Sequence, residues 1–122
     1  MEGMGHLFVD ATIFSSDLAR QRPIRLLVDT GSTYTWISRE ILEELSIQPK
    51  RERGFRTVDG RILKRQIGEA ALEYLGERAT SIVVFAEEGE EEVLGVHALE
   101  GWGMEFDPVA NEIRKVKAIL AV

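Results

Sequence analysis

Residues 26–32 read LLVDTGS, an apolar run that delivers an aspartate into a Thr-Gly-Ser turn, and TYTWIS follows at residues 33–38. An ionised carboxylate at the end of a buried strand is costly unless it is paired or hydrogen-bonded. Gly31 permits the tight turn, and the neighbouring hydroxyl and N–H groups can satisfy the carboxylate of Asp29. These residues alone leave two interpretations open: an aspartate that caps its own turn, or an aspartate that performs chemistry.

The bulk composition predicts a single soluble domain over residues 1–122. Hydrophobic residues make up 44% of the chain and charged residues 30%, and both values are ordinary for a globular protein. The net charge of −6 argues against nucleic acid as a partner, because phosphate binding needs a basic surface. The absence of cysteine excludes disulfides, thiolate catalysis and cysteine-based zinc sites. The first 17 residues lack a basic stretch and a long apolar stretch, which predicts no signal peptide, no membrane partner and a cytoplasmic location.

The pattern along the chain is mostly that of short strands. We expect strands at 6–14, 24–28 and 33–38, a loop at 15–23, and a short helix at 39–47 with Ser38 as its N-cap and Pro49 beyond its end. Asp-Gly at 59–60 predicts a hairpin within 55–68, and a second hairpin over 69–86 turns near Gly76. An acidic loop at 87–92 leads to an apolar strand end, a glycine and a short helix within 93–103. The remaining segment, 104–122, begins with a strand and an Asp-Pro turn, and its last part fits either a strand or a helix.

Few other groups offer chemistry. The two histidines, His6 and His97, lie far apart in sequence and have no neighbouring ligand pair, so packing or surface positions suit them better than metal binding. We expect neither a metal site nor a cofactor, since no phosphate-binding or dinucleotide-binding glycine motif is present. The run EEGEEE at 87–92 is typical of a solvated loop with repelling charges.

The order of these features resembles the retroviral-type, or retropepsin-like, aspartic proteases, which are half-length relatives of pepsin. The resemblance covers nearly the whole chain from Leu7, and its specific parts are LLVDTGSTYTWIS and EVLGVHALEGWGMEFDP. It implies a mostly β fold: a small closed β-barrel with one or two short helices that forms a dimer.

The same resemblance implies roles for individual residues. Asp29 takes the place of the catalytic carboxylate, and Thr30 that of the residue that bridges the two halves of the site. Gly31 lets its amide approach the carboxylate, and Ser32 is expected to hydrogen-bond the outer carboxylate oxygen. The hairpin tip, formed by Val58, Asp59, Gly60 and Arg61, corresponds to a flap over the substrate. Leu94 and Gly95 correspond to the loop-strand that braces the catalytic turn from below.

The implied chemistry needs two carboxylates, and the chain has one Asp-Thr-Gly and no room for a second lobe. Two aspartates about 3 Å apart share one proton, so that the ionised one activates water and the protonated one polarises the scissile carbonyl. This requirement predicts a homodimer with one Asp29 from each subunit, acting as an endopeptidase on a peptide or protein held in extended form. The resemblance also implies that the apolar tail AILAV (118–122) contributes to the dimer and that apolar side chains flank the scissile bond.

Two departures from the viral pattern leave alternatives open. The hairpin tip carries Asp59 and Arg61 where a neutral, glycine-rich tip is usual. Val96 and His97 replace an arginine and its acidic or amide neighbour, so the ion pair that this arginine supplies to the dimer is absent. One alternative is an inactive dimer of the same fold that serves as a protein-binding module. Another is a nucleotide-binding fragment of the actin and sugar-kinase type, although that fold needs two large lobes.

Overall fold

The computed structural model describes residues 6–118 and 121, and most of these residues lie in β-strands. The elements are β1 (Phe8–Phe14), β2 (Gln21–Val28), β3 (Thr35–Ser38), α1 (Arg39–Glu44), β4 (Arg51–Arg56), β5 (Ile62–Tyr74), β6 (Glu77–Ala86), β7 (Val93–Leu94), α2 (Val96–Gly101), β8 (Met104–Asp107) and β9 (Glu112–Lys115). The described helices are short, so the sheet carries the architecture. No helix among the described residues has the length and apolar character needed to cross a membrane.

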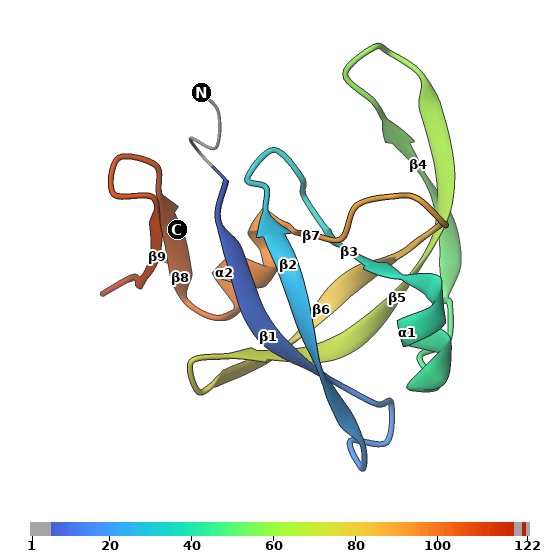
Figure 1. Cartoon of the computed structure of the whole chain (residues 1–122), viewed down its shortest axis with the longest axis horizontal. Coiled ribbons are helices and arrows are strands. Elements are labelled where there is room, and N and C mark those ends of the chain that lie inside the picture. Colours follow the sequence, from blue (N-terminus) through green and yellow to red (C-terminus); the bar gives the residue numbers. More distant parts are fainter. Residues whose placement is uncertain (1–5, 119–120, 122) are drawn as a thin grey trace.

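The main sheet closes on itself to form a small barrel (Figure 1). Its seven strands follow the order β1-β2-β7-β3-β6-β5-β4, and β1 also pairs with β5. β2 runs parallel to β7, and β3 runs parallel to β6, whereas the other pairings within this sheet are antiparallel. The predicted closed β-barrel with short helices is therefore confirmed for the single chain.

The burial patterns follow from the position of each strand in the barrel. β2 alternates, with Ile24 and Leu26 buried and Arg25 exposed, because one of its faces meets solvent. The end of β6, residues 83–86, is buried continuously, since α1 and α2 both pack against this strand. The barrel core is filled by large apolar side chains, among them Phe85, Ile13, Leu72 and Leu94.

Two predicted boundaries shift for local reasons. β2 begins at Gln21 and not at residue 24, and Pro23 is tolerated because only β1 pairs with this end of the strand. α1 starts as predicted, with the Ser38 hydroxyl accepting from the Ile41 N–H at 3.3 Å. The helix ends at Glu44, short of residue 47, and Ser46 then adopts a positive φ of 60° that no helix continues.

The two predicted hairpins share one long strand. β5 spans 13 residues; its first half pairs with β4 and its second half with β6. β4 starts at Arg51, four residues before the predicted arm. The β4–β5 turn is longer than a two-residue turn, whereas Leu75 and Gly76 form the expected tight turn with φ of 49° and 83°. The β4–β5 hairpin projects from the barrel at the end where the turn after β2 also lies (Figure 1).

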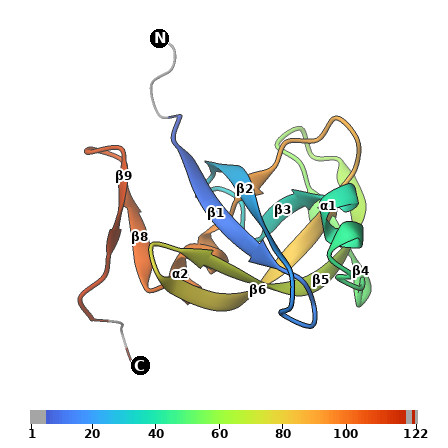
Figure 2. The ribbon, with the colours of Figure 1, turned by 60° about the horizontal axis from the view of Figure 1, so that its bottom comes forward.

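A second small sheet lies beside the barrel. β8 pairs with β9, so the segment after the Asp-Pro turn is a strand. Figure 2 shows this hairpin standing apart from the barrel strands, with α2 between them. The Trp102 indole fastens the end of α2, since its buried N–H donates to the carbonyl of Leu72 on β5 at 3.0 Å. The expected role of the AILAV tail concerns Ile119, Leu120 and Val122, which lie outside the described residues.

Candidate active site

The turn after β2 holds the Asp29 carboxylate through the backbone. The Gly31 N–H donates to Asp29 Oδ1 at 3.0 Å, and the Ser32 N–H donates to the Asp29 carbonyl at 3.0 Å. A Cβ on residue 31 would lie 3.2 Å from Oδ1, so the glycine permits this close approach. The carboxylate is thereby oriented without the use of another charged side chain.

The strand β7 supports this turn from the barrel side. The Asp29 N–H donates to the Leu94 carbonyl at 3.0 Å, which continues the parallel pairing of β2 with β7. The Gly95 N–H donates to the buried Thr35 hydroxyl at 3.0 Å. Leu94 is fully buried, so the support rests on the barrel core. Leu94 and Gly95 thus lie directly against the segment that carries Asp29.

Gly95 allows two backbone segments to approach more closely than any other residue would. A Cβ at this position would lie 2.3 Å from the Tyr34 carbonyl oxygen and 2.8 Å from that of Ser32. The next two residues complete the junction: the Val96 N–H donates to the Ser32 carbonyl at 2.9 Å, and the His97 N–H donates to the Thr33 carbonyl at 3.1 Å. The residues that replace the viral arginine pattern therefore contribute their backbone to the turn.

Two expectations about this turn need correction. Ser32 does not donate to the Asp29 carboxylate, because its hydroxyl proton goes to the Tyr34 carbonyl at 2.7 Å. Asp29 is also not buried: it is exposed in the single chain, together with Thr30 and Gly31. The single chain therefore does not incur the cost of burying an ionised carboxylate.

A cleft of about 410 Å³ lies between the Asp29 turn and β4. Aromatic rings line or border it: Phe55 meets Tyr34 edge-on at 6.2 Å between ring centroids and Trp36 at 5.2 Å. Tyr34 in turn meets His97 at 5.4 Å. Arg53 and Arg56 of β4 also line the cleft. An extended chain laid here would pass the carboxylate, an aromatic wall and two cations.

The tip of the β4–β5 hairpin lies away from this cleft lining and closes on itself. Asp59 accepts from the Thr57 hydroxyl and pairs with Arg61 at 3.1 Å. The hydrogen bond from Thr57, with that from Arg61, lowers the pKa of Asp59, so the carboxylate stays ionised in mild acid. Gly60 adopts a φ of 88°, and Val58 is fully exposed. The two tip charges thus compensate each other, and an apolar side chain remains free at the tip.

The acidic loop 87–92 is more ordered by ion pairs than the run of like charges suggests. Glu87 pairs with Arg39 at 2.9 Å, and Glu90 forms a two-bond pair with Arg65 of β5. Glu92 accepts from the Ser38 N–H at 2.8 Å. The prediction of a solvated loop with repelling charges is therefore wrong for these three carboxylates, each of which has a partner. The Arg65–Glu90 pair fastens the arm of the β4–β5 hairpin to the barrel.

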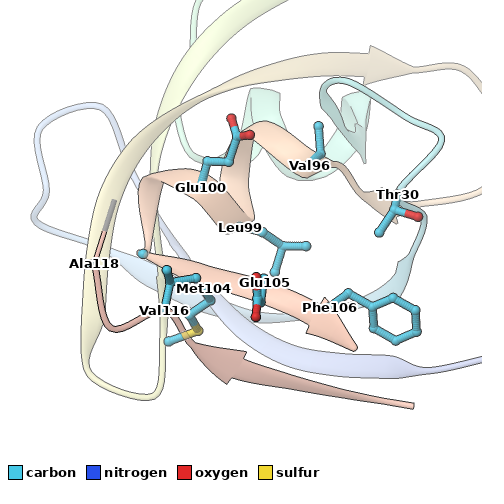
Figure 3. Close-up of a pocket in the computed structure, with 10 residues that line it drawn as sticks. Thr30, Val96, Leu99, Glu100, Met104, Glu105, Phe106, Val116 and Ala118 are labelled. Atoms are coloured by element: carbon cyan, nitrogen blue, oxygen red, sulfur yellow. The ribbon is translucent and has the colours of Figure 1, made fainter. Parts of the chain in front are cut away.

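A second, more apolar groove of about 520 Å³ lies on the other side of Thr30. Figure 3 shows Leu99 of α2, with Met104 and Phe106 of β8, beside this groove and Thr30 at its edge. Val96 lines the groove where the viral pattern has arginine. This face therefore presents apolar side chains next to the exposed Asp29 turn.

The remaining candidates from the sequence stay apart. His6 lies before β1 and is exposed, and His97 meets the ring of Tyr34, a residue of the cleft lining, edge-on. Within residues 6–118 and 121, no three His, Asp or Glu side chains form a group that could hold a metal ion. Thr35, Tyr34 and Arg53 were not predicted as site residues. Thr35 is the first residue of β3, Tyr34 precedes it, and Arg53 stands in a charged stretch, and none of these positions carries a local signal of its role.

Comparisons with known proteins agree with this geometry. A family model described as "gag-polyprotein putative aspartyl protease" matches residues 18–101. Among solved structures, the chain is similar to a retropepsin-like aspartic protease from Rickettsia conorii, with a TM-score of 0.59 and 19% sequence identity. That similarity covers 84% of this chain and 76% of the Rickettsia chain. A search of curated protein sequences finds no match.

Gly95→Ala is expected to destabilise the fold by about 3 kcal/mol, because the new methyl group meets backbone atoms that cannot move aside. Thermal and urea unfolding would measure the loss. Gly101→Ala is the matched control, since its Cβ would meet only the Ala79 side chain at 3.4 Å. Equal stability of the two variants would contradict the close approach of β7 to the turn.

The pair between Glu90 and Arg65 predicts a pH-dependent stability. The hydrogen bond from Arg65 lowers the pKa of Glu90 below its ordinary 4.5. Its stabilisation, about 1 kcal/mol, is thus present above pH 4.5 and lost as the pH falls through the lowered value.

We therefore expect Glu90→Gln to lower the melting temperature at pH 7, with the difference from wild type shrinking below pH 4.5. Glu88→Gln, an exposed position in the same loop, is the control and is expected to show little change at either pH. A difference for Glu90→Gln that stays constant with pH would rule out the ion pair as its cause.

Proposed function

Because the chain belongs to the gag-polyprotein aspartyl protease family, we propose that it is an aspartic endopeptidase that works as a homodimer. The observation that carries the proposal is the Asp29 turn, whose carboxylate accepts from the Gly31 N–H at 3.0 Å at the side of a cleft. Each subunit would contribute one Asp29 to a site on the twofold axis.

The proposed chemistry uses the two carboxylates in different protonation states. The pair holds one proton; the ionised carboxylate takes a proton from water, which attacks the scissile carbonyl, and the protonated carboxyl polarises that carbonyl. The proton later passes to the leaving nitrogen, so the peptide bond breaks and the pair returns to its starting state. The exposure of Asp29 in the single chain is consistent with a partner covering it.

The partner that we propose is a second copy of this chain. One chain supplies one Asp-Thr-Gly turn, and the chemistry needs two. The apolar groove beside Thr30, lined by Val96, Leu99 and Phe106, supports this assignment, because it gives the proposed interface apolar contacts where the viral arginine is missing. The β4–β5 hairpin would act as the flap, closing over an extended peptide in the cleft.

Asp29→Asn is expected to abolish cleavage while leaving the dimer intact. Digestion of a denatured protein mixture, read by mass spectrometry, would measure cleavage, and analytical ultracentrifugation would measure the dimer. Asp10→Asn, an exposed aspartate on β1, is the matched control and is expected to cleave normally.

A mixing experiment tests whether the site is shared. With three Asp29→Asn chains for each wild-type chain, activity per wild-type chain is expected to fall to about a quarter, because random pairing leaves few wild-type pairs. Unchanged activity would place the whole site in one chain. A confirmed dimer that cleaves nothing would instead favour the protein-binding module.

Hydrolysis is expected to be faster in mild acid than at pH 8, because one carboxyl of the pair must keep its proton. The rate of cleavage of one peptide between pH 4 and pH 8 would measure this. Thermal unfolding over the same range is the control, since loss of fold at low pH would mimic a loss of catalysis. A flat profile for a folded dimer would argue against the shared proton.

A further inference from the structure

We propose that Arg53 and Arg56 make this cleft a binding site for peptides with an acidic side chain near the scissile bond. This inference rests on the proposed function and names its substrate class. Both arginines line the same cleft as Asp29, and both belong to the exposed strand β4. An extended peptide that reaches Asp29 therefore passes both of these residues of β4.

Among residues 6–118 and 121, these two arginines differ from most other arginines in having no acidic partner. Arg22, Arg39, Arg61, Arg65, Arg78 and Arg114 each pair with a carboxylate. Within residues 6–118 and 121, neither Arg53 nor Arg56 has such a pair, although acidic residues outnumber basic ones in the chain. Their charges are thus available to a ligand.

The position of Arg53 limits which part of a ligand it can meet. Residues two apart on a strand share a face, so Arg53 lies on the same side of β4 as Phe55. Phe55 meets the ring of Tyr34 edge-on, and both residues line the cleft, so this side of β4 faces the cleft. Across the ladder, Arg53 is opposite Arg65, and Arg65 already holds Glu90. Arg53 and Arg65 carry the same charge, so they do not pair with each other, and the carboxylate of Glu90 is already bound to Arg65. Arg53 can therefore bind a carboxylate of a ligand.

The chemistry of a guanidinium group defines the ligand class. Its planar donors match a carboxylate, and such charge-assisted bonds are stronger than neutral ones. An Asp or Glu side chain beside an aromatic or aliphatic one would fit the cations and the aromatic rings of Tyr34 and Phe55 that line the cleft. The apolar preference implied by resemblance is thus replaced, at one subsite, by a preference for an acid.

The first test compares cleavage sites. Wild-type protein would digest a peptide library made from a cell proteome, and mass spectrometry would score acidic residues near each cut. For a matched pair of peptides carrying Glu or Gln at the preferred position, kcat/KM is expected to be about tenfold higher with Glu. High salt is expected to reduce that ratio by screening the charges.

Substitutions test whether Arg53 and Arg56 cause the preference for an acidic residue. Arg53→Gln with Arg56→Gln is expected to remove the preference, whereas Arg51→Gln, on the same strand but outside the cleft lining, is expected to keep it. Arg53→Glu with Arg56→Glu is expected to favour a Lys peptide over a Glu peptide, a gain that misfolding cannot produce. Equal cleavage of Glu and Gln peptides by wild type would overturn the inference.

A binding measurement separates this inference from the proposed function. Asp29→Asn protein would be titrated against fluorescein-labelled Ala-Glu and Ala-Gln octapeptides, read by anisotropy. Tighter binding of the Ala-Glu peptide that is lost in Arg53→Gln with Arg56→Gln supports the cleft assignment even if wild type cuts nothing. Cleavage without any preference for the acid, in either measurement, refutes the assignment and leaves the protease proposal intact.

Discussion

The contact that the rest of the site depends on is the close passage of Gly95 beneath the segment from Ser32 to Thr35. It leaves no room for a side chain, and it places consecutive backbone groups of β7 and α2 on the turn after β2. The Asp29 N–H is held by Leu94, and the Asp29 carboxylate is held in turn by Gly31. Because these bonds are made by the backbone, the carboxylate is held without another charged side chain.

Around this turn, charged side chains in different places have different surroundings. Ion pairs to Arg39 and Arg65 fasten the acidic loop and the hairpin arm, and the pair at the hairpin tip neutralises itself. The cleft keeps two cations without such partners among the described residues. The face beside Thr30 is apolar where a viral-type chain has an ion pair. Structural charge, ligand-facing charge and apolar contact thus occupy separate parts of a small barrel.

The features that could be predicted from the sequence are those that depend on adjacent residues. The Asp-Thr-Gly-Ser turn, the Ser38 cap and the tight turn at Gly76 each follow from a few adjacent residues. Contacts between distant residues had no such signal. No pattern in RERG (51–54) predicted an element, yet these residues form part of an edge strand because β5 pairs with them. The partners of the acidic loop lie 25 and 48 positions away, so only the folded barrel reveals them.

The length of β5 has a mechanical consequence. A single strand of 13 residues runs from the core, where Leu72 is fully buried, out along the projecting hairpin to Ile62. Nothing interrupts its ladder with β4 between Arg51 and Arg56. The two-stranded ribbon is thus continuous with the barrel sheet, and the Arg65–Glu90 pair ties it to the acidic loop. The twist and the side-chain contacts of this ribbon set its bending stiffness. That stiffness would govern how fast the proposed flap admits an extended peptide to the cleft.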